Sequence, residues 1–178
     1  NTPKLNFEME AEVFQNVAYL EMVFYMNRGE FAHAEALIPK VSEGLVQYAS
    51  HLNTARKLAI QYNMGLLYFI LEKMTLSRKI FASIEDGPKT DHRFDIQSSA
   101  RLMQLLILLD AEEIELLDYR LRSFLRKDNR DTNKFEKEAL GFMRDALRSQ
   151  TKAEFKLLCE DFCKVAESQN LATGLEYN

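Results

Sequence analysis

The fold is decided by a stretch in the middle of the chain that reads Tyr62-Asn63-Met64-Gly65-Leu66-Leu67-Tyr68. A counterpart precedes it at a fixed offset of 43 positions, the separation of Tyr19 and Tyr62. The same offset carries one series of residues onto another: Tyr19, Tyr25, Phe31, Ala34, Ile38 and Val41 onto Tyr62, Tyr68, Met74, Ser77, Phe81 and Ile84. A repeat of this length that preserves an aromatic pair, a turn and an apolar helical face is typical of stacked helix pairs.

Composition places the chain among ordinary globular proteins. Its 178 residues are 47% hydrophobic and 28% charged, with a net charge of −4. Glycine and proline are too scarce for an all-β protein, which needs a turn about every 8–12 residues. The mild acidity argues against nucleic-acid binding, which requires a basic surface, and no apolar run approaches the ~18–20 residues of a membrane span. We therefore expect a soluble domain over 1–178 that binds neither nucleic acid nor membrane.

Apolar residues recur at helical spacing along nearly the whole chain and predict an all-α protein of about eight helices. The predicted ranges are 7–26, about 30–50 with Pro39 inside it, 54 to a turn around 73, 75–85, a helix from about 92 that includes Ile107, about 111–126, 132–148, and a helix from 151 that includes Val165, with a frayed tail from Asn170. The first range carries two apolar series: Val13, Val17, Leu20 and Phe24, and Met9, Phe14, Ala18 and Met22. Paired, these helices give repeats over about 7–50, 54–86, 92–127 and 132–168.

Local signals set the ends of several helices. Gly29 can adopt the left-handed conformation that closes a helix, and Asn53 or Thr54 can cap the next one. The segment Asp86-Gly87-Pro88-Lys89-Thr90-Asp91 is the clearest break, and Asp91 can cap the helix after it. Thr151-Lys152-Ala153-Glu154 is a capping box, which predicts the start of the last helix.

The second copy resembles a tetratricopeptide repeat. That family places a large residue, a small residue and Tyr on its first helix, as Tyr62, Gly65 and Tyr68 do here, and a small residue followed by an aromatic on its second, as Ser77 and Phe81 do. The small residues let two helices approach and the aromatic rings fill the remaining space. Because the offset exceeds the usual repeat of about 34 residues, the helices must be longer than usual. The resemblance implies about eight antiparallel helices stacked as pairs in a right-handed superhelix.

A later stretch looks like large, functionally uncharacterised tetratricopeptide-like proteins of Bacteroidetes-type bacteria. It runs from Arg93-Phe94-Asp95-Ile96-Gln97 to Tyr119-Arg120-Leu121-Arg122-Ser123. Those proteins are longer, and this sequence begins without methionine, so we expect a piece of a longer chain. A cytoplasmic location is the default expectation.

The resemblance also implies a binding surface. In tetratricopeptide arrays the first helix of each pair lines a concave groove that holds peptides, which places in the groove Tyr19, Tyr62, Asn63, Leu66, Phe69, Gln97 and Arg101. Asn63 and Arg101 match two positions of a clamp that grips a peptide's terminal carboxylate, whereas Tyr19 and Val23 replace its lysine and asparagine, so we do not expect a complete clamp. The apolar groove positions are either covered by neighbouring helices of the chain or form a docking surface for a helix or peptide.

Other candidate sites carry weaker signals. The basic residues Arg120, Arg122 and Arg126 indicate a solvated helix face or, second, a patch for an anionic protein partner. Glu30 and His33 have a spacing used in helical di-metal sites, but the required second motif is missing, so we expect no metal. We expect no catalytic residues and no cofactor, and we read Cys159 and Cys163 as buried thiols.

These observations favour a non-enzymatic scaffold or adaptor domain that binds a protein or peptide. A homo-oligomer is compatible with the same features. The alternative is a regulatory sensor domain that binds a small ligand or signalling peptide in its groove. A helical enzyme whose site forms only on folding is a further alternative.

Overall fold

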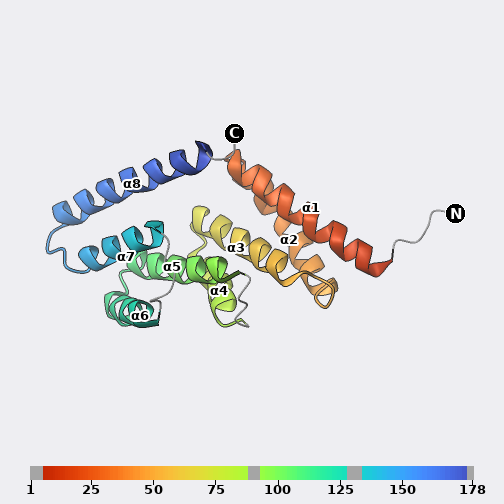
Figure 1. The fold of residues 1–178 in the computed structure, drawn as a ribbon, viewed down its shortest axis with the longest axis horizontal. Coiled ribbons are helices and arrows are strands. Elements are labelled where there is room, and N and C mark those ends of the chain that lie inside the picture. Colours follow the sequence, from red (N-terminus) through yellow and green to blue (C-terminus); the bar gives the residue numbers. More distant parts are fainter. Residues whose placement is uncertain (1–5, 88–92, 128–133, 176–178) are drawn as a thin grey trace. The chain divides into compact units, whose positions relative to one another are not determined.

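The computed structural model covers residues 1–178 and describes residues 6–87, 93–127 and 134–175, without the side chains of 127 and 169–175. Within these ranges the chain forms eight α-helices and no strand. The helices are α1 (Phe7–Asn27), α2 (Phe31–Gln47), α3 (Thr54–Ile70), α4 (Met74–Glu85), α5 (Phe94–Asp110), α6 (Ile114–Lys127), α7 (Lys134–Ala146) and α8 (Lys152–Leu175). The predicted all-α fold is confirmed (Figure 1).

The chain divides within α5 into two compact units, residues 1–101 and residues 102–178. In the first unit α1 packs against both α2 and α3, α2 also contacts α3, and α3 packs along α4 (Figure 1). In the second unit α7 contacts both α6 and α8. Each unit has its own apolar cluster.

The turns that follow α1, α3 and α5 share one backbone geometry. Each contains a residue with positive φ: Gly29 at 71°, Glu72 at 57° and Glu112 at 54°. The amide of the next residue donates to a carbonyl in the last turn of the preceding helix: Glu30 to Tyr25 at 2.9 Å, Lys73 to Tyr68 at 2.8 Å and Glu113 to Leu108 at 3.0 Å. This is a Schellman closure, which satisfies carbonyl groups that the helix end leaves without partners.

These turns fix the register of the helices that follow them. Gly29 and Glu72 are 43 positions apart, the offset seen in the sequence, while Glu72 and Glu112 are 40 apart. Counted from its turn, each following helix buries side chains at the same positions: Ala34, Ser77 and Leu117, then Ile38, Phe81 and Leu121, then Val41, Ile84 and Phe124. Three helical hairpins, α1–α2, α3–α4 and α5–α6, therefore carry their core residues in a common pattern.

Close contact between α3 and α4 depends on small side chains. The hydroxyl of Ser77 donates to the carbonyl of Gly65 at 2.9 Å. A Cβ added at Gly65 would lie 2.7 Å from Cε1 of Phe81, whose ring is fully buried and packs edge-on against Tyr62. The predicted roles of Gly65, Ser77 and Phe81 are thus confirmed.

The core of the first unit also fixes the start of α3. Ala18 and Met22 of α1 meet Ile38 and Val41 of α2 and the buried face of α3, formed by Ile60, Met64 and Leu67. Next to this cluster, the side-chain carbonyl of Gln15 accepts a hydrogen bond from the amide of Asn53 at 2.9 Å. Asn53 in turn caps α3, because its Oδ1 accepts hydrogen bonds from the amides of Ala55 and Arg56.

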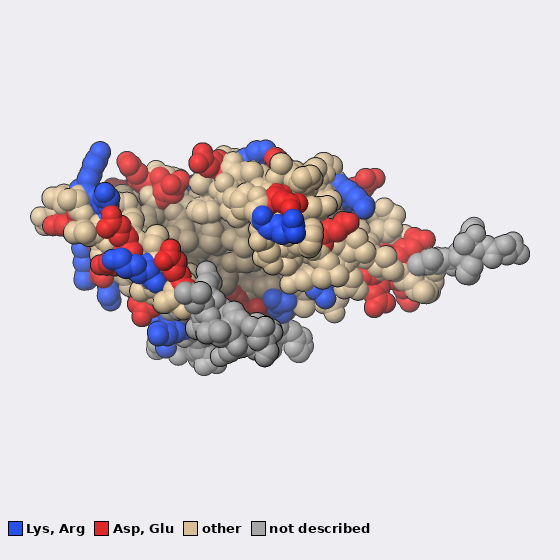
Figure 2. All heavy atoms as spheres, turned by 90° about the horizontal axis from the view of Figure 1, so that it is seen from above, with Lys and Arg blue, Asp and Glu red and all other residues tan. Residues whose placement is uncertain are grey.

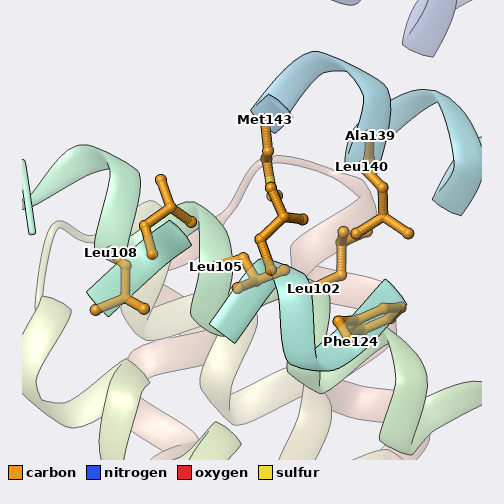
Figure 3. Packing of buried hydrophobic residues seen from close by; sticks show 9 residues of the cluster. Leu102, Leu105, Leu108, Phe124, Ala139, Leu140 and Met143 are labelled. Atoms are coloured by element: carbon orange, nitrogen blue, oxygen red, sulfur yellow. The ribbon is translucent and has the colours of Figure 1, made fainter. Parts of the chain in front are cut away.

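The second unit is held together by leucines from three helices. Figure 3 shows Leu102, Leu105 and Leu108 of α5 with Phe124 of α6 and Ala139, Leu140 and Met143 of α7. The α8 helix adds Phe162, which stacks on Phe142 at a centroid distance of 4.7 Å.

Most predicted helix ends agree with the structure to within a few residues. The sixth helix, predicted from about Ala111, begins somewhat later, at Ile114, because Glu112 has positive φ and closes the turn. The expected fraying from Asn170 is wrong, since α8 continues to Leu175. Thr151 caps α8 as predicted, but the carboxylate of Glu154 accepts from the amide of Gln150 rather than Thr151. The predicted cap at Asp91 lies outside the described residues.

Replacing Gly65 with alanine tests the close contact between α3 and α4. We expect Gly65→Ala to lower the free energy of unfolding by about 1–2 kcal/mol, because overpacking against Phe81 outweighs the gain in helix propensity. Gly141 is the matched control, because a Cβ there would meet nothing within 4 Å. Gly141→Ala should raise the free energy of unfolding by up to about 1 kcal/mol. Urea denaturation measures the free energy of unfolding of both variants. Equal changes in Gly65→Ala and Gly141→Ala would contradict the close contact between α3 and α4.

The turn geometry makes a second prediction. Glutamate with positive φ is strained relative to glycine, so Glu72→Gly should raise the free energy of unfolding by about 0.5–1 kcal/mol. The control Glu72→Ala removes the same charge but keeps a Cβ, and should bring no such gain. Urea denaturation measures the free energy of unfolding of the two variants. If Glu72→Ala and Glu72→Gly raised it equally, Glu72 would not be strained.

Candidate functional site

The residues predicted to line a peptide groove lie on α1, α3 and α5, and several are engaged within the protein. The guanidinium carbon of Arg56 lies 4.4 Å from the ring centroid of Tyr19. The ring of Tyr62 packs against Phe81, on the side of α3 that faces α4. Asn63, Leu66 and Phe69 are half-buried.

The two predicted groove residues on α5 differ in their exposure. Gln97 is 3% exposed, so its side chain offers almost no surface to a peptide. Arg101 is half-buried, and its guanidinium carbon lies 5.7 Å from the ring centroid of Phe94. At the start of the same helix, hydrogen bonds from Arg93 lower the pKa of the Asp95 carboxyl group. Of the two predicted clamp residues, Arg101 already contacts Phe94 and Asn63 is half-buried.

The predicted basic patch on α6 is partly neutralised by its neighbours. Arg120 donates to the side-chain carbonyl of Gln104 at 2.7 Å, and Arg122 forms an exposed salt bridge with Asp118 at 2.6 Å. Arg126 is exposed. The contact of Arg122 and the exposure of Arg126 fit the interpretation of a solvated helix face, whereas Arg120 is half-buried and reaches the buried Gln104. On the face that Figure 2 displays, acidic and basic side chains are interspersed rather than gathered in a large field of one sign.

The remaining candidates make local contacts. The imidazole of His33 stacks on Tyr25 and lies 3.7 Å from the carboxylate of Glu30, which also accepts a hydrogen bond from Arg28. Cys159 and Cys163 are free thiols, and the prediction that both are buried is wrong because Cys159 is half-buried and Cys163 is exposed. Desolvation raises the pKa of the Cys159 thiol, and the negative charges of Cys163 and Glu160 add to this effect.

An apolar feature that the sequence did not single out as a site is the exposed face of α1. Five large side chains at helical spacing, each 40–62% exposed, form the α1 stripe: Met9, Val13, Val17, Leu20 and Phe24. Over the positions from Met9 to Phe24 the stripe extends about 22 Å, at about 1.5 Å per residue. A continuous apolar strip of this length is typical of a surface that contacts another molecule.

A groove of about 330 Å³ lies beside the α1 stripe, between α1 and α2. Its α1 wall includes Val13 and Val17, and its α2 wall includes Leu37 and Val41. Phe14 packs deeply against α2 here, because a Cβ added at Gly44 would lie 2.1 Å from its ring. The residues that line the groove are Glu10, Val13, Phe14, Val17, Ala18, Glu21, Leu37, Lys40, Val41 and Tyr48.

The charges around the groove are mainly negative. The α1 helix carries Glu8, Glu10, Glu12 and Glu21 but no lysine or arginine. Glu10 and Glu21 line the groove, and Lys40 of α2 is its one basic lining residue among those the structure describes. The groove is therefore mainly apolar, with acidic side chains on its α1 wall.

Comparison with known proteins gives no assignment for this site. No family model, no curated protein and no solved structure matches the chain. In the parts of the chain that the structure describes, no helix is long and apolar enough to cross a membrane. The same parts contain no cluster of three or more His, Cys, Asp or Glu side chains that could hold a metal ion.

In the second hairpin, the residues equivalent to two members of the α1 stripe are buried. At the offset of 43, Val17 and Phe24 of the α1 stripe correspond to Ile60 and Leu67 of α3. Ile60 and Leu67 are fully buried in the cluster that α3 forms with α1 and α2. Val17 and Phe24 of the α1 stripe are thus the counterparts of two residues that the protein itself covers one hairpin later. The two apolar series on α1 were the sequence signal for this, because a helix that is apolar on two faces has two surfaces to cover.

Truncating equivalent residues on α1 and α3 tests this difference. Leu67→Ala should lower the free energy of unfolding by about 2–5 kcal/mol, since it leaves a cavity in the core. Phe24→Ala should cost less than about 1 kcal/mol, because the Phe24 ring is largely exposed and little area is lost from the core. Thermal or urea denaturation measures both, and a large loss from Phe24→Ala would show that the α1 stripe is covered.

Proposed function

We propose that this chain is a non-enzymatic protein-interaction domain that binds an amphipathic helix of a partner on the α1 stripe and its groove. The proposal includes the tetratricopeptide-like architecture, in which successive helical hairpins stack into a right-handed superhelix. The common turn geometry and core pattern of the first three hairpins support that architecture. In such an arrangement each hairpin packs against the next, and the stacked helices offer an extended surface for recognition.

One observation carries the proposal: α1 exposes Val17 and Phe24, whose counterparts Ile60 and Leu67 are buried on α3. An apolar face of this geometry is matched by another helix, which places side chains at i, i+3, i+4 and i+7 into a groove. A partner helix of about 15 residues would span the α1 stripe. The groove between α1 and α2 would receive its largest apolar side chain.

The volume of the groove also supports a second candidate function, a sensor domain for a small ligand. At about 330 Å³ the groove falls within the range of small-molecule pockets. Leu20 separates the two functions, because it belongs to the α1 stripe but does not line the groove. A helix would contact Leu20, whereas a small ligand held in the groove would not.

Selection from a phage-displayed library of helical peptides, with residues 1–178 as bait, tests the proposal. We expect selected peptides to lose at least ~10-fold in affinity against Leu20→Asp, since a charge would then interrupt the apolar contact. Leu76→Asp is the matched control, because Leu76 is an exposed leucine on α4, away from the site. Fluorescence anisotropy measures the affinities. Failure to enrich any peptide, or peptides indifferent to Leu20, would overturn helix binding on this face.

A further inference from the structure

The groove contains a carboxylate in a position where the protein elsewhere places a buried side chain. Glu21 lines the groove and is half-buried. Among the described residues, its carboxylate forms no salt bridge, not even with Lys40 on the opposite wall. Its counterpart at the offset of 43 is Met64, which is 5% exposed and belongs to the core of the first unit. A helix that covered α1 as α1 and α2 cover α3 would therefore bury Glu21.

The third hairpin shows how a polar group in this position is satisfied. Counted from its turn, the equivalent residue of α5 is Gln104, which is 4% exposed. Its side-chain carbonyl accepts a hydrogen bond from the guanidinium of Arg120, on α6. The residue of α2 equivalent to Arg120 is Leu37, so the first hairpin has no guanidinium at that position.

Burial of Glu21 without a cation would oppose docking. An unpaired carboxylate in an apolar contact costs several kcal/mol, whereas a paired and hydrogen-bonded one does not carry that full penalty. Two further charges of α1 act in the same direction, because Glu8 and Glu10 would attract basic side chains at the edge of the contact. The partner must therefore bring positive charge to an otherwise apolar face.

The same charges disfavour a second copy of this chain as the occupant. Two α1 helices packed against each other would oppose glutamates to glutamates. The face with which the protein covers α3 offers Ala18, Met22, Ala34, Ile38 and Val41, none of which is a cation. Neither mode of self-association supplies a partner for Glu21.

From these observations we infer that the groove between α1 and α2 binds a basic amphipathic helix of another protein, with a lysine or arginine of its apolar face paired to Glu21. This inference rests on the proposed function and specifies the chemistry of the partner. The α1 stripe supplies the apolar contact area, and Glu21 selects against helices that are neutral or acidic at the paired position.

Two synthetic helical peptides of about 20 residues, measured against residues 1–178 by fluorescence anisotropy, test the inference. They share a leucine-rich face flanked by lysines and differ at one central position of that face, which is lysine in one and glutamate in the other. We expect the unmodified protein to prefer the lysine peptide by at least ~10-fold. Glu21→Lys should reverse the order, and Glu21→Gln should reduce the preference.

The control variant Glu12→Lys makes the same charge change on α1 at an exposed residue that does not line the groove. It should retain the preference for the lysine peptide. If Glu12→Lys shifts the preference as far as Glu21→Lys does, the pairing with Glu21 is overturned.

Further outcomes separate the inference from the function on which it rests. Equal affinities for the two peptides, both lost in Leu20→Asp, would overturn the pairing with Glu21 while helix binding remained. Failure of both peptides to bind would overturn helix binding as well. Self-association of the protein in analytical ultracentrifugation that Leu20→Asp removes would identify a second copy as the occupant and would also overturn the inference.

Discussion

The turn that ends α1, α3 and α5 is the constraint on which the rest of the structure depends. In each, a residue with positive φ and its neighbour return amide hydrogen bonds to the last helical turn. The direction and rotation of the second helix follow from this geometry. Side chains as different as Ala34, Ser77 and Leu117 are consequently buried at the same place in each hairpin. A residue that fails to adopt positive φ there would alter the packing of a whole helix.

Much of this fold could be predicted from the sequence. Apolar spacing located the helices, Asn53 and Thr151 indicated two starts, and the offset of 43 related the first two hairpins. The start of α6 could not be predicted in the same way. Glycine marks the first turn at Gly29, but glutamate occupies the equivalent positions Glu72 and Glu112, where it indicates helix rather than a left-handed residue.

The candidate site was harder to predict than the fold, because apolar periodicity identifies a face without identifying what covers it. Val17 and Phe24 look like core residues in the sequence, as do Ile60 and Leu67, yet only the second pair is buried. Gln97 and Tyr62 present the reverse case. The resemblance places both in the groove. In the structure, however, the Gln97 side chain is buried and the Tyr62 ring packs on Phe81. Exposure depends on which helices lie nearby, and that information is not local in sequence.

The hydrogen bond between Gln15 and the amide of Asn53 joins the wall of the groove to the beginning of another helix. Gln15 directly follows Phe14, whose ring lines the groove, and Asn53 holds the first amides of α3. Rotation of α1 about its axis would strain this bond or carry the cap of α3 with it. A molecule that displaces Phe14 would therefore also disturb the start of α3. The rate of amide hydrogen exchange at Ala55 and Arg56 would then change when the groove is occupied.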